Sequence, residues 1–198
     1  MKNQEKGIIT VTPMTIPGRE TCLALLKKYG TPEHIILHSE RVWQVGKLLG
    51  EGLLKNSRPI DMELLEASCL LHDIAKYVCI VEGEGRHDLK GGEILTREGL
   101  PELGDIVAQH VVLRDNNPNA IGIEHLTNYA DKRVVHDKIV SLDERFVYLK
   151  DTYGQNPRAI ELLMKMKEQI VAIETRIFAL LDFEPDDVIG LIRGYSAD

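Results

Sequence analysis

The sequence predicts an all-α protein, a helical bundle that ends in a long C-terminal helix. Apolar residues recur every three or four positions along most of the chain, whereas the strict alternation typical of strands is rare. Glycine and proline residues divide these periodic stretches at intervals that suit the ends of helices. We find no internal repeat and no low-complexity segment, so one packed core is the simplest architecture.

Composition limits the kinds of protein that this chain can be. Its 198 residues, 43% hydrophobic and 28% charged, are enough for one globular core. No apolar run approaches the ~20 residues of a membrane span, and residues 1–16 lack the apolar stretch of a secretory signal, so we expect a cytoplasmic protein. The net charge of -7 disfavours an extended nucleic-acid surface but allows a local pocket for a phosphate ester. Three cysteines without a CxxC pair suit reduced thiols.

The first two helices are delimited by proline and glycine. Pro17 opens a helix that we expect to stop at Gly30. Thr31 and Pro32 then supply an N-cap and a first-turn proline for a long helix. His38 lies on the apolar stripe of this helix, so its side chain is expected to be buried.

The next helices carry further histidines and aspartates. Asp61 caps a helix that we expect to run through His72 and Asp73. An Asp88 cap begins another helix, which ends near Gly99. Both helices therefore bring ionisable side chains toward the expected core.

The second half of the sequence continues the helical pattern. Pro101 starts a helix that we expect to carry His110. Residues 113–122 read as a turn-rich loop, the kind of loop that often borders a ligand pocket. A helix that holds Asp131 follows it, and another extends from about Arg145 to Tyr153.

The chain closes with a long amphipathic helix from about Pro157 to Phe183 and a short helix after Pro185. We expect the long helix to belong to the core, and a homodimer surface is the alternative. The predicted organisation is one domain over residues 1–198. Its parts are an N-terminal extension (1–16), a core (about 31–150) and a C-terminal helical extension (155–198).

One short motif places ionisable groups inside an apolar run. Residues 70–76 read LLHDIAK and contain His72, Asp73 and Lys76. Burying an imidazole beside a carboxylate costs several kcal/mol unless something compensates, and a metal ion suits both groups. We interpret this pair as the centre of a metal site.

Six candidate metal ligands are distributed over five consecutive segments, and all are imidazoles or carboxylates: His38, His72, Asp73, His87, His110 and Asp131. Such a set suits one or two divalent transition metal ions, Fe, Mn, Co, Zn or Ni, whereas an oxygen-only set would indicate Mg or Ca. His34, four residues before His38, is expected not to be a ligand. His125 and His136 are expected to face solvent.

The order of these residues resembles that of the HD-domain metal-dependent phosphohydrolases. The matching positions are the first histidine of residues 38–42 (HSERV), the His72-Asp73 pair with Lys76, and the aspartate of residues 129–132 (YADK). The likeness covers about residues 31–150. It implies an α-helical bundle whose core holds the metal, in agreement with the helical periodicity.

His87 and His110 extend this likeness to the two-metal branch of the family, which has two more histidines between the HD pair and the last aspartate. The resemblance implies that Asp73 bridges two metals, that one metal is held also by His38, His72 and Asp131, and the other by His87 and His110. Many members of that branch have adjacent histidines at the second place. In this sequence Val111 follows His110.

The expected function is hydrolysis of a nucleotide or other small phosphate ester. A divalent cation lowers the pKa of coordinated water toward ~7 and polarises a phosphoryl oxygen. Asp73 and Lys76 are the expected catalytic residues. The expected phosphate-binding cations lie one turn after His38 and His72 or directly after Asp131, and they are Arg41, Lys76, Lys132 and Arg133.

Two other functions remain open on the same residues. A diiron oxygenase uses the same six-ligand set in a branch that resembles this family, and it predicts iron with oxygen consumption and no phosphate release. A non-catalytic sensor that binds metal or nucleotide would keep the bundle without turnover.

Overall fold

The computed structural model describes residues 15–114 and 120–195, and helices dominate this part of the chain. In chain order the elements are α1 (Arg19–Lys28), α2 (Glu33–Lys55), α3 (Met62–Leu71), α4 (Lys76–Glu82), α5 (His87–Arg97), α6 (Pro101–Val107), α7 (Ile123–Lys132), β1 (Val134–Val135), β2 (Lys138–Ile139), α8 (Leu142–Tyr153), α9 (Pro157–Phe178), a 3₁₀ turn (Pro185–Asp187) and α10 (Val188–Tyr195). The all-α prediction is therefore confirmed. Among the described helices, none is both long and apolar enough to cross a membrane.

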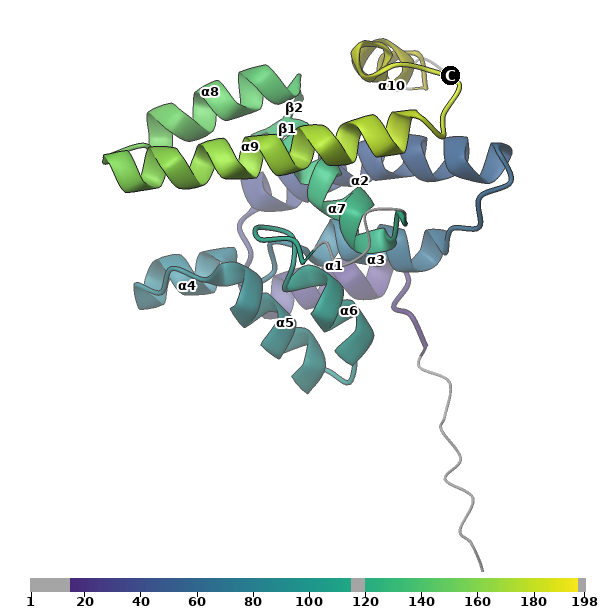
Figure 1. The fold of residues 1–198 in the computed structure, drawn as a ribbon. Coiled ribbons are helices and arrows are strands. Elements are labelled where there is room, and N and C mark those ends of the chain that lie inside the picture. Colours follow the sequence, from purple (N-terminus) through teal and green to yellow (C-terminus); the bar gives the residue numbers. More distant parts are fainter. Residues whose placement is uncertain (1–14, 115–119, 196–198) are drawn as a thin grey trace, which may run out of the picture.

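Three helices, α2, α3 and α7, pack on one another in the middle of the bundle. In Figure 1, α8 and α9 lie together above them, while α5 and α6 lie together below. One buried apolar cluster lies on the α8–α9 side and includes Tyr129 and Ile173. A second lies on the α1, α5 and α6 side and includes Leu71 and Ile94. Trp43 packs against both clusters, so the central helices link the two halves of the core.

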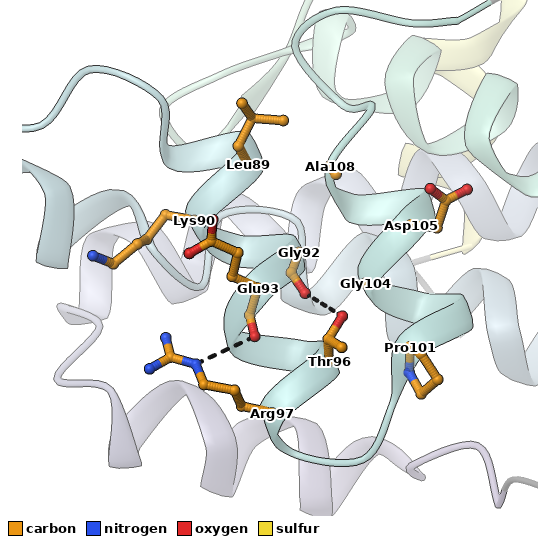
Figure 2. A pocket seen from close by; sticks show the side chains of 10 residues that line it. All are labelled: Leu89, Lys90, Gly92, Glu93, Thr96, Arg97, Pro101, Gly104, Asp105 and Ala108. Carbon is orange, nitrogen blue, oxygen red and sulfur yellow. Dashed lines mark hydrogen bonds between the residues drawn. The ribbon is translucent and has the colours of Figure 1, made fainter.

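Two glycines let α5 and α6 approach closely. A Cβ atom at Gly92 would lie 2.7 Å from the carbonyl oxygen of Gly104, and one at Gly104 would lie 2.6 Å from the carbonyl oxygen of Gly92. Figure 2 shows these glycines facing each other, with the Thr96 hydroxyl donating a hydrogen bond to the Gly92 carbonyl at 2.8 Å. Only residues without a side chain fit at this contact. It sets the relative position of His87, which begins α5, and His110, which follows α6.

Helix α3 ends at Leu71, so the expected continuous helix through His72 and Asp73 is wrong. Residues 72–75 form turns in which Ile74 N–H donates to the Leu71 carbonyl, before α4 begins at Lys76. The imidazole Nδ1 of His72 lies 2.8 Å from the Cys69 carbonyl oxygen, an acceptor that a continuing helix would use for its own ladder. The side chain therefore competes with the helix, and the metal-site pair lies at a break between two helices.

The helix expected to carry His110 also ends early. Its last residue is Val107, and His110 lies in the turn that follows. Again the imidazole Nδ1 lies near the carbonyl oxygen three residues earlier, that of Val107, at 2.8 Å. His72 and His110 thus have the same local arrangement at the ends of two different helices.

Smaller differences concern helix starts. The N-cap of α2 is Pro32 rather than Thr31, and α5 begins at His87, with Asp88 inside its first turn and paired with Arg86. Asp88 is 1% exposed, because this ion pair lets the carboxylate be buried. In the 113–122 loop, residues 115–119 lie outside the described part of the chain, as does most of the N-terminal extension.

The C-terminal part differs from expectation in three places. Helix α9 ends at Phe178 instead of Phe183, and its buried residues include Ile173, as expected of a core helix. A hairpin of two strands, β1 and β2, lies between α7 and α8. Each strand has only two residues, which is too short to give a periodic signal. His125 is 4% exposed, so its expected position in solvent is wrong, and its Nδ1 accepts a hydrogen bond from the Gly122 N–H. His136 is exposed, as expected.

Candidate metal centre

The structure brings all six candidate ligands into one buried cluster. They come from α2, the turn between α3 and α4, the start of α5, the turn after α6, and the end of α7. Five of them are almost fully buried, and His87 is the exception, with 26% of its side chain exposed. His34, which we expected not to be a ligand, is exposed on α2.

Asp73 lies at the middle of this cluster, with one carboxylate oxygen toward each pair of histidines. Its Oδ2 is 3.4 Å from Nε2 of His72 and 3.9 Å from Nε2 of His38. Its Oδ1 is 3.3 Å from Nε2 of His87 and 3.5 Å from Nε2 of His110. One carboxylate can therefore serve two neighbouring triads of ligand atoms, each of which is compact enough for a metal ion.

The first triad consists of His38, His72 and Asp73, and Asp131 lies beside it. Oδ1 of Asp131 lies 3.1 Å from Nε2 of His38 and 3.7 Å from Nε2 of His72. The second triad consists of Asp73, His87 and His110. Its two imidazole Nε2 atoms are 3.2 Å apart.

Backbone carbonyls determine which nitrogen of three imidazoles is free to coordinate. Nδ1 of His38, His72 and His110 lies 2.9, 2.8 and 2.8 Å from a carbonyl oxygen. A carbonyl oxygen only accepts hydrogen bonds, so Nδ1 carries the proton, and in a neutral ring Nε2 keeps its lone pair. Outer hydrogen bonds of this kind orient the histidine ligands of metal sites.

The resulting arrangement fits a bound cation. Nε2 of His72 is buried and makes no hydrogen bond among residues 15–114 and 120–195. In a neutral His38, Nε2 and the Asp131 carboxylate oxygen are two acceptors only 3.1 Å apart. A divalent metal ion is the group that would stabilise these converging lone pairs, and imidazole with carboxylate is a donor set that such ions bind.

The electrostatics keep His110 and the two aspartates in their coordinating forms, whereas the neighbouring carboxylates of Asp73 and Asp131 raise the pKa of His72. Burial lowers the pKa of His110 to about 4, so this ring is neutral at pH 7. Burial alone would raise the pKa of Asp73, but the Lys76 ammonium holds it well below its ordinary value. For Asp131, Lys132 and Arg145 outweigh burial and likewise lower the pKa. Both aspartates are therefore ionised carboxylates at neutral pH.

Two lysines contact these carboxylates directly. Nζ of Lys76 lies 2.7 Å from Oδ2 of Asp73, and 32% of its side chain is exposed, so its ammonium can also reach a ligand. Nζ of Lys132 lies 2.7 Å from Oδ2 of Asp131 and donates to the His110 carbonyl at 3.0 Å. Because Lys132 is 3% exposed, its contacts hold protein groups in place.

The two expected phosphate-binding arginines lie elsewhere. Arg133 donates hydrogen bonds to the Tyr129 hydroxyl and to the carbonyls of Val140 and Pro185, and it is 2% exposed. It has a structural role that joins α7 to the C-terminal segment, contrary to the phosphate-binding role expected from its position. Arg41 donates to the Asp137 carbonyl and lines a separate hollow of about 600 Å³.

Arg145 is a site residue that sequence reasoning missed. This α8 residue is 8% exposed, and its Nη2 lies 3.3 Å from Oδ1 of Asp131. The available signal was its position on the apolar stripe of that helix, between Leu142 and Leu149. An arginine on a buried stripe indicates an ionic partner within the core.

The hollow between α5 and α6 is not part of this centre. It measures about 760 Å³ and is lined by side chains such as Lys90, Arg97 and Asp105, as Figure 2 shows. None of the six cluster residues lines it. This hollow is therefore separate from the histidine–aspartate cluster.

Comparison with known proteins shows the family to which the chain belongs. A family model described as the HD domain matches residues 35–182, a range that contains all six candidate ligands. The chain is 26% identical over 190 residues to a tRNA (cytidine(56)-2'-O)-methyltransferase of Picrophilus torridus, a match that covers 85% of this chain and 52% of that protein. It is 36% identical over 97 residues to a protein of the same name from Thermoplasma volcanium, over 48% of this chain and 26% of that protein. The chain thus spans about half the length, or less, of these curated relatives. No solved structure matches it significantly.

Proposed function

This chain belongs to the HD-domain family, and from that premise we propose that it is a metal-dependent phosphohydrolase that acts on a nucleotide or other small phosphate ester. One observation carries the proposal: the Nε2 atoms of four imidazoles and two ionised carboxylates converge at a centre that also presents the Lys76 ammonium. A cation beside metal ligands suits an anionic substrate.

The residues present fit one or two metal ions. His38, His72 and Asp131 would hold one ion, His87 and His110 the other, and Asp73 would contact both. A divalent ion at such a site activates water for attack and polarises a phosphoryl oxygen.

The protein groups around the ligands have separate tasks. Lys76 is placed to bind a phosphoryl oxygen and to neutralise the charge that develops on it. Lys132 keeps Asp131 ionised and oriented, and through the His110 carbonyl it ties the two triads together. Burial of these charges away from water strengthens each interaction.

The curated relatives are named for methyl transfer to tRNA, and the chain covers about half of one and a quarter of the other. We do not extend methyl transfer to this chain, because its histidine–aspartate cluster suits metal-assisted hydrolysis. Because their names mention tRNA, nucleotides and short RNA fragments are the phosphate esters to test first.

The test combines metal analysis with a substrate screen. We expect the purified full chain to contain a transition metal and to release phosphate from a nucleotide or another phosphate ester. Asp73→Ala should remove the metal and lower turnover to background, because it takes one ligand from each triad. Asp151→Ala, at an exposed position on α8, is the matched control and should retain both properties.

Other outcomes separate the alternatives. Oxygen consumption by an iron-loaded protein, without phosphate release, would favour a diiron oxygenase. A protein that binds no Mn or Co and turns over no ester would favour a sensor module. Wild-type turnover in Asp73→Ala would refute the proposed centre.

A further inference from the structure

Arg145 brings a third cation to the centre from α8, a helix that supplies none of the six candidate ligands. Its guanidinium lies 5.7 Å from the centroid of the Tyr148 ring. That ring in turn contacts the ring of His136, whose carbonyl binds Nδ1 of His38. The Arg145 guanidinium is thus linked, through Tyr148 and His136, to the carbonyl that orients the candidate ligand His38.

The ion pair with Asp131 does not by itself explain why the Arg145 guanidinium is buried at this centre. Asp131 Oδ2 already has the Lys132 ammonium at 2.7 Å, and Oδ1 faces His38 more closely than it faces Arg145. Nε of Arg145 is buried and makes no hydrogen bond within the described part of the chain. At least one donor of this rigid guanidinium, which lies beside the Asp131 carboxylate, therefore has no hydrogen-bond partner among the described residues.

The charges of the cluster indicate what kind of ligand that would be. Two carboxylates, those of Asp73 and Asp131, face three cations, those of Lys76, Lys132 and Arg145. Each divalent ion adds to the positive excess. A terminal phosphate carries between one and two negative charges at neutral pH, because its second pKa is ~6. An internal phosphodiester carries one, so the centre favours the terminal group.

We infer that Arg145 binds the phosphoryl oxygens of the substrate and, together with Lys76, makes the centre select a terminal phosphate over an internal phosphodiester. This inference rests on the proposed function and names its substrate class. A guanidinium offers two parallel N–H donors to a phosphate, which an ammonium cannot do.

The direct test is calorimetric binding of inorganic phosphate to the manganese-loaded full chain. Arg145→Gln should weaken phosphate binding at least tenfold, and Arg145→Lys should weaken it several-fold. Both variants should keep the wild-type metal content. Lys150→Gln removes one positive charge from an exposed position of the same helix and should leave binding within twofold of wild type.

Three results would overturn the inference. Unchanged phosphate affinity in Arg145→Gln excludes a phosphate contact, and loss of metal from that variant shows instead that Arg145 only positions Asp131. If circular dichroism shows that Arg145→Gln does not fold, Arg145→Lys decides, and wild-type phosphate affinity in that variant contradicts a guanidinium site.

Substrate selectivity is measured with p-nitrophenyl phosphate and bis-p-nitrophenyl phosphate. Wild type should have the higher kcat/KM for the monoester, and Arg145→Gln should reduce that preference at least tenfold. A wild-type preference for the diester contradicts the inferred selectivity. Arg145-dependent phosphate binding without any hydrolysis would refute the proposed function alone, whereas hydrolysis with Arg145-independent phosphate binding would refute this inference alone.

Discussion

Three imidazoles at the centre share one arrangement, in which Nδ1 binds a backbone carbonyl and Nε2 faces the ligand cluster. The carbonyls belong to His136, Cys69 and Val107, which lie on different elements. Each of these bonds fixes both the tautomer and the ring plane before any ion binds. The centre is therefore preorganised by backbone groups.

Lys132 offers the sharpest test at the scale of a single residue. Lys132→Met keeps the length of the side chain but leaves the buried Asp131 carboxylate without its 2.7 Å partner. We expect a loss of ~3 kcal/mol in the free energy of unfolding and a 10- to 100-fold weaker metal affinity. Urea denaturation and competition with a chelator measure the two effects.

The control for this prediction is Lys165→Met, which removes a lysine from the exposed pair with Glu161 on α9. Exposed pairs of this type contribute little, so stability and metal affinity should change only slightly. Equal effects of the two substitutions would contradict the positioning role of Lys132.

Site residues could be predicted from the sequence where a motif orders them along the chain. His72 and Asp73 stand out because they interrupt an apolar run, and the order of the other ligands follows the family's pattern. Arg145 belongs to no motif, and its position on the apolar stripe of α8 does not reveal which helix that stripe contacts. The misassigned Arg133 illustrates the same limit, since adjacency to Asp131 does not determine direction on a helix.

Helices could be predicted from periodicity, but several of their ends could not. Helices α3 and α6 stop where a histidine side chain binds the carbonyl three residues earlier, at Cys69 and Val107. Such side-chain bonds depend on where the rest of the cluster lies, which local propensity does not contain. The β1–β2 hairpin escaped prediction because two-residue strands have no measurable period.

The contact between α5 and α6 leads to a prediction at the scale of elements. In Gly92→Ala, the added Cβ would meet the Gly104 carbonyl oxygen, a backbone atom that cannot rotate away. The clash should exceed the ~1 kcal/mol gain in helix propensity and give a net loss of ~1–2 kcal/mol. Since His87 begins α5 and His110 follows α6, a lower metal content is also expected.

Gly85→Ala is the comparison for that substitution, because nothing lies within 4 Å of a Cβ at this position. Its free energy of unfolding should stay within ~0.5 kcal/mol of wild type. Denaturant unfolding together with elemental analysis would measure both variants. A Gly92→Ala protein as stable and as rich in metal as Gly85→Ala would show that the close packing of α5 and α6 has no part in building the centre.

At the scale of the whole molecule, the ligand cluster connects elements from both halves of the core. His38 and Asp131 lie on α2 and α7, which contact the α8–α9 side, while His87 and His110 flank the α5–α6 pair. Without a cation, the lone pairs of the histidine Nε2 atoms and of the Asp73 and Asp131 carboxylate oxygens repel one another. Metal binding should therefore stabilise the assembly of all five segments together.

Thermal unfolding with and without metal tests this coupling. An ion that binds only the folded chain adds ~2.7 kcal/mol at a concentration 100 times its Kd. For a chain of this size that corresponds to a rise of ~5–10 °C in Tm. We expect this difference between manganese-loaded and chelator-treated protein in differential scanning calorimetry, and no such difference in Asp73→Ala, which lacks the carboxylate shared by both triads. An equal Tm for the loaded and chelated wild type would mean that the cluster holds its geometry without a cation, and would remove the physical reason for placing one there.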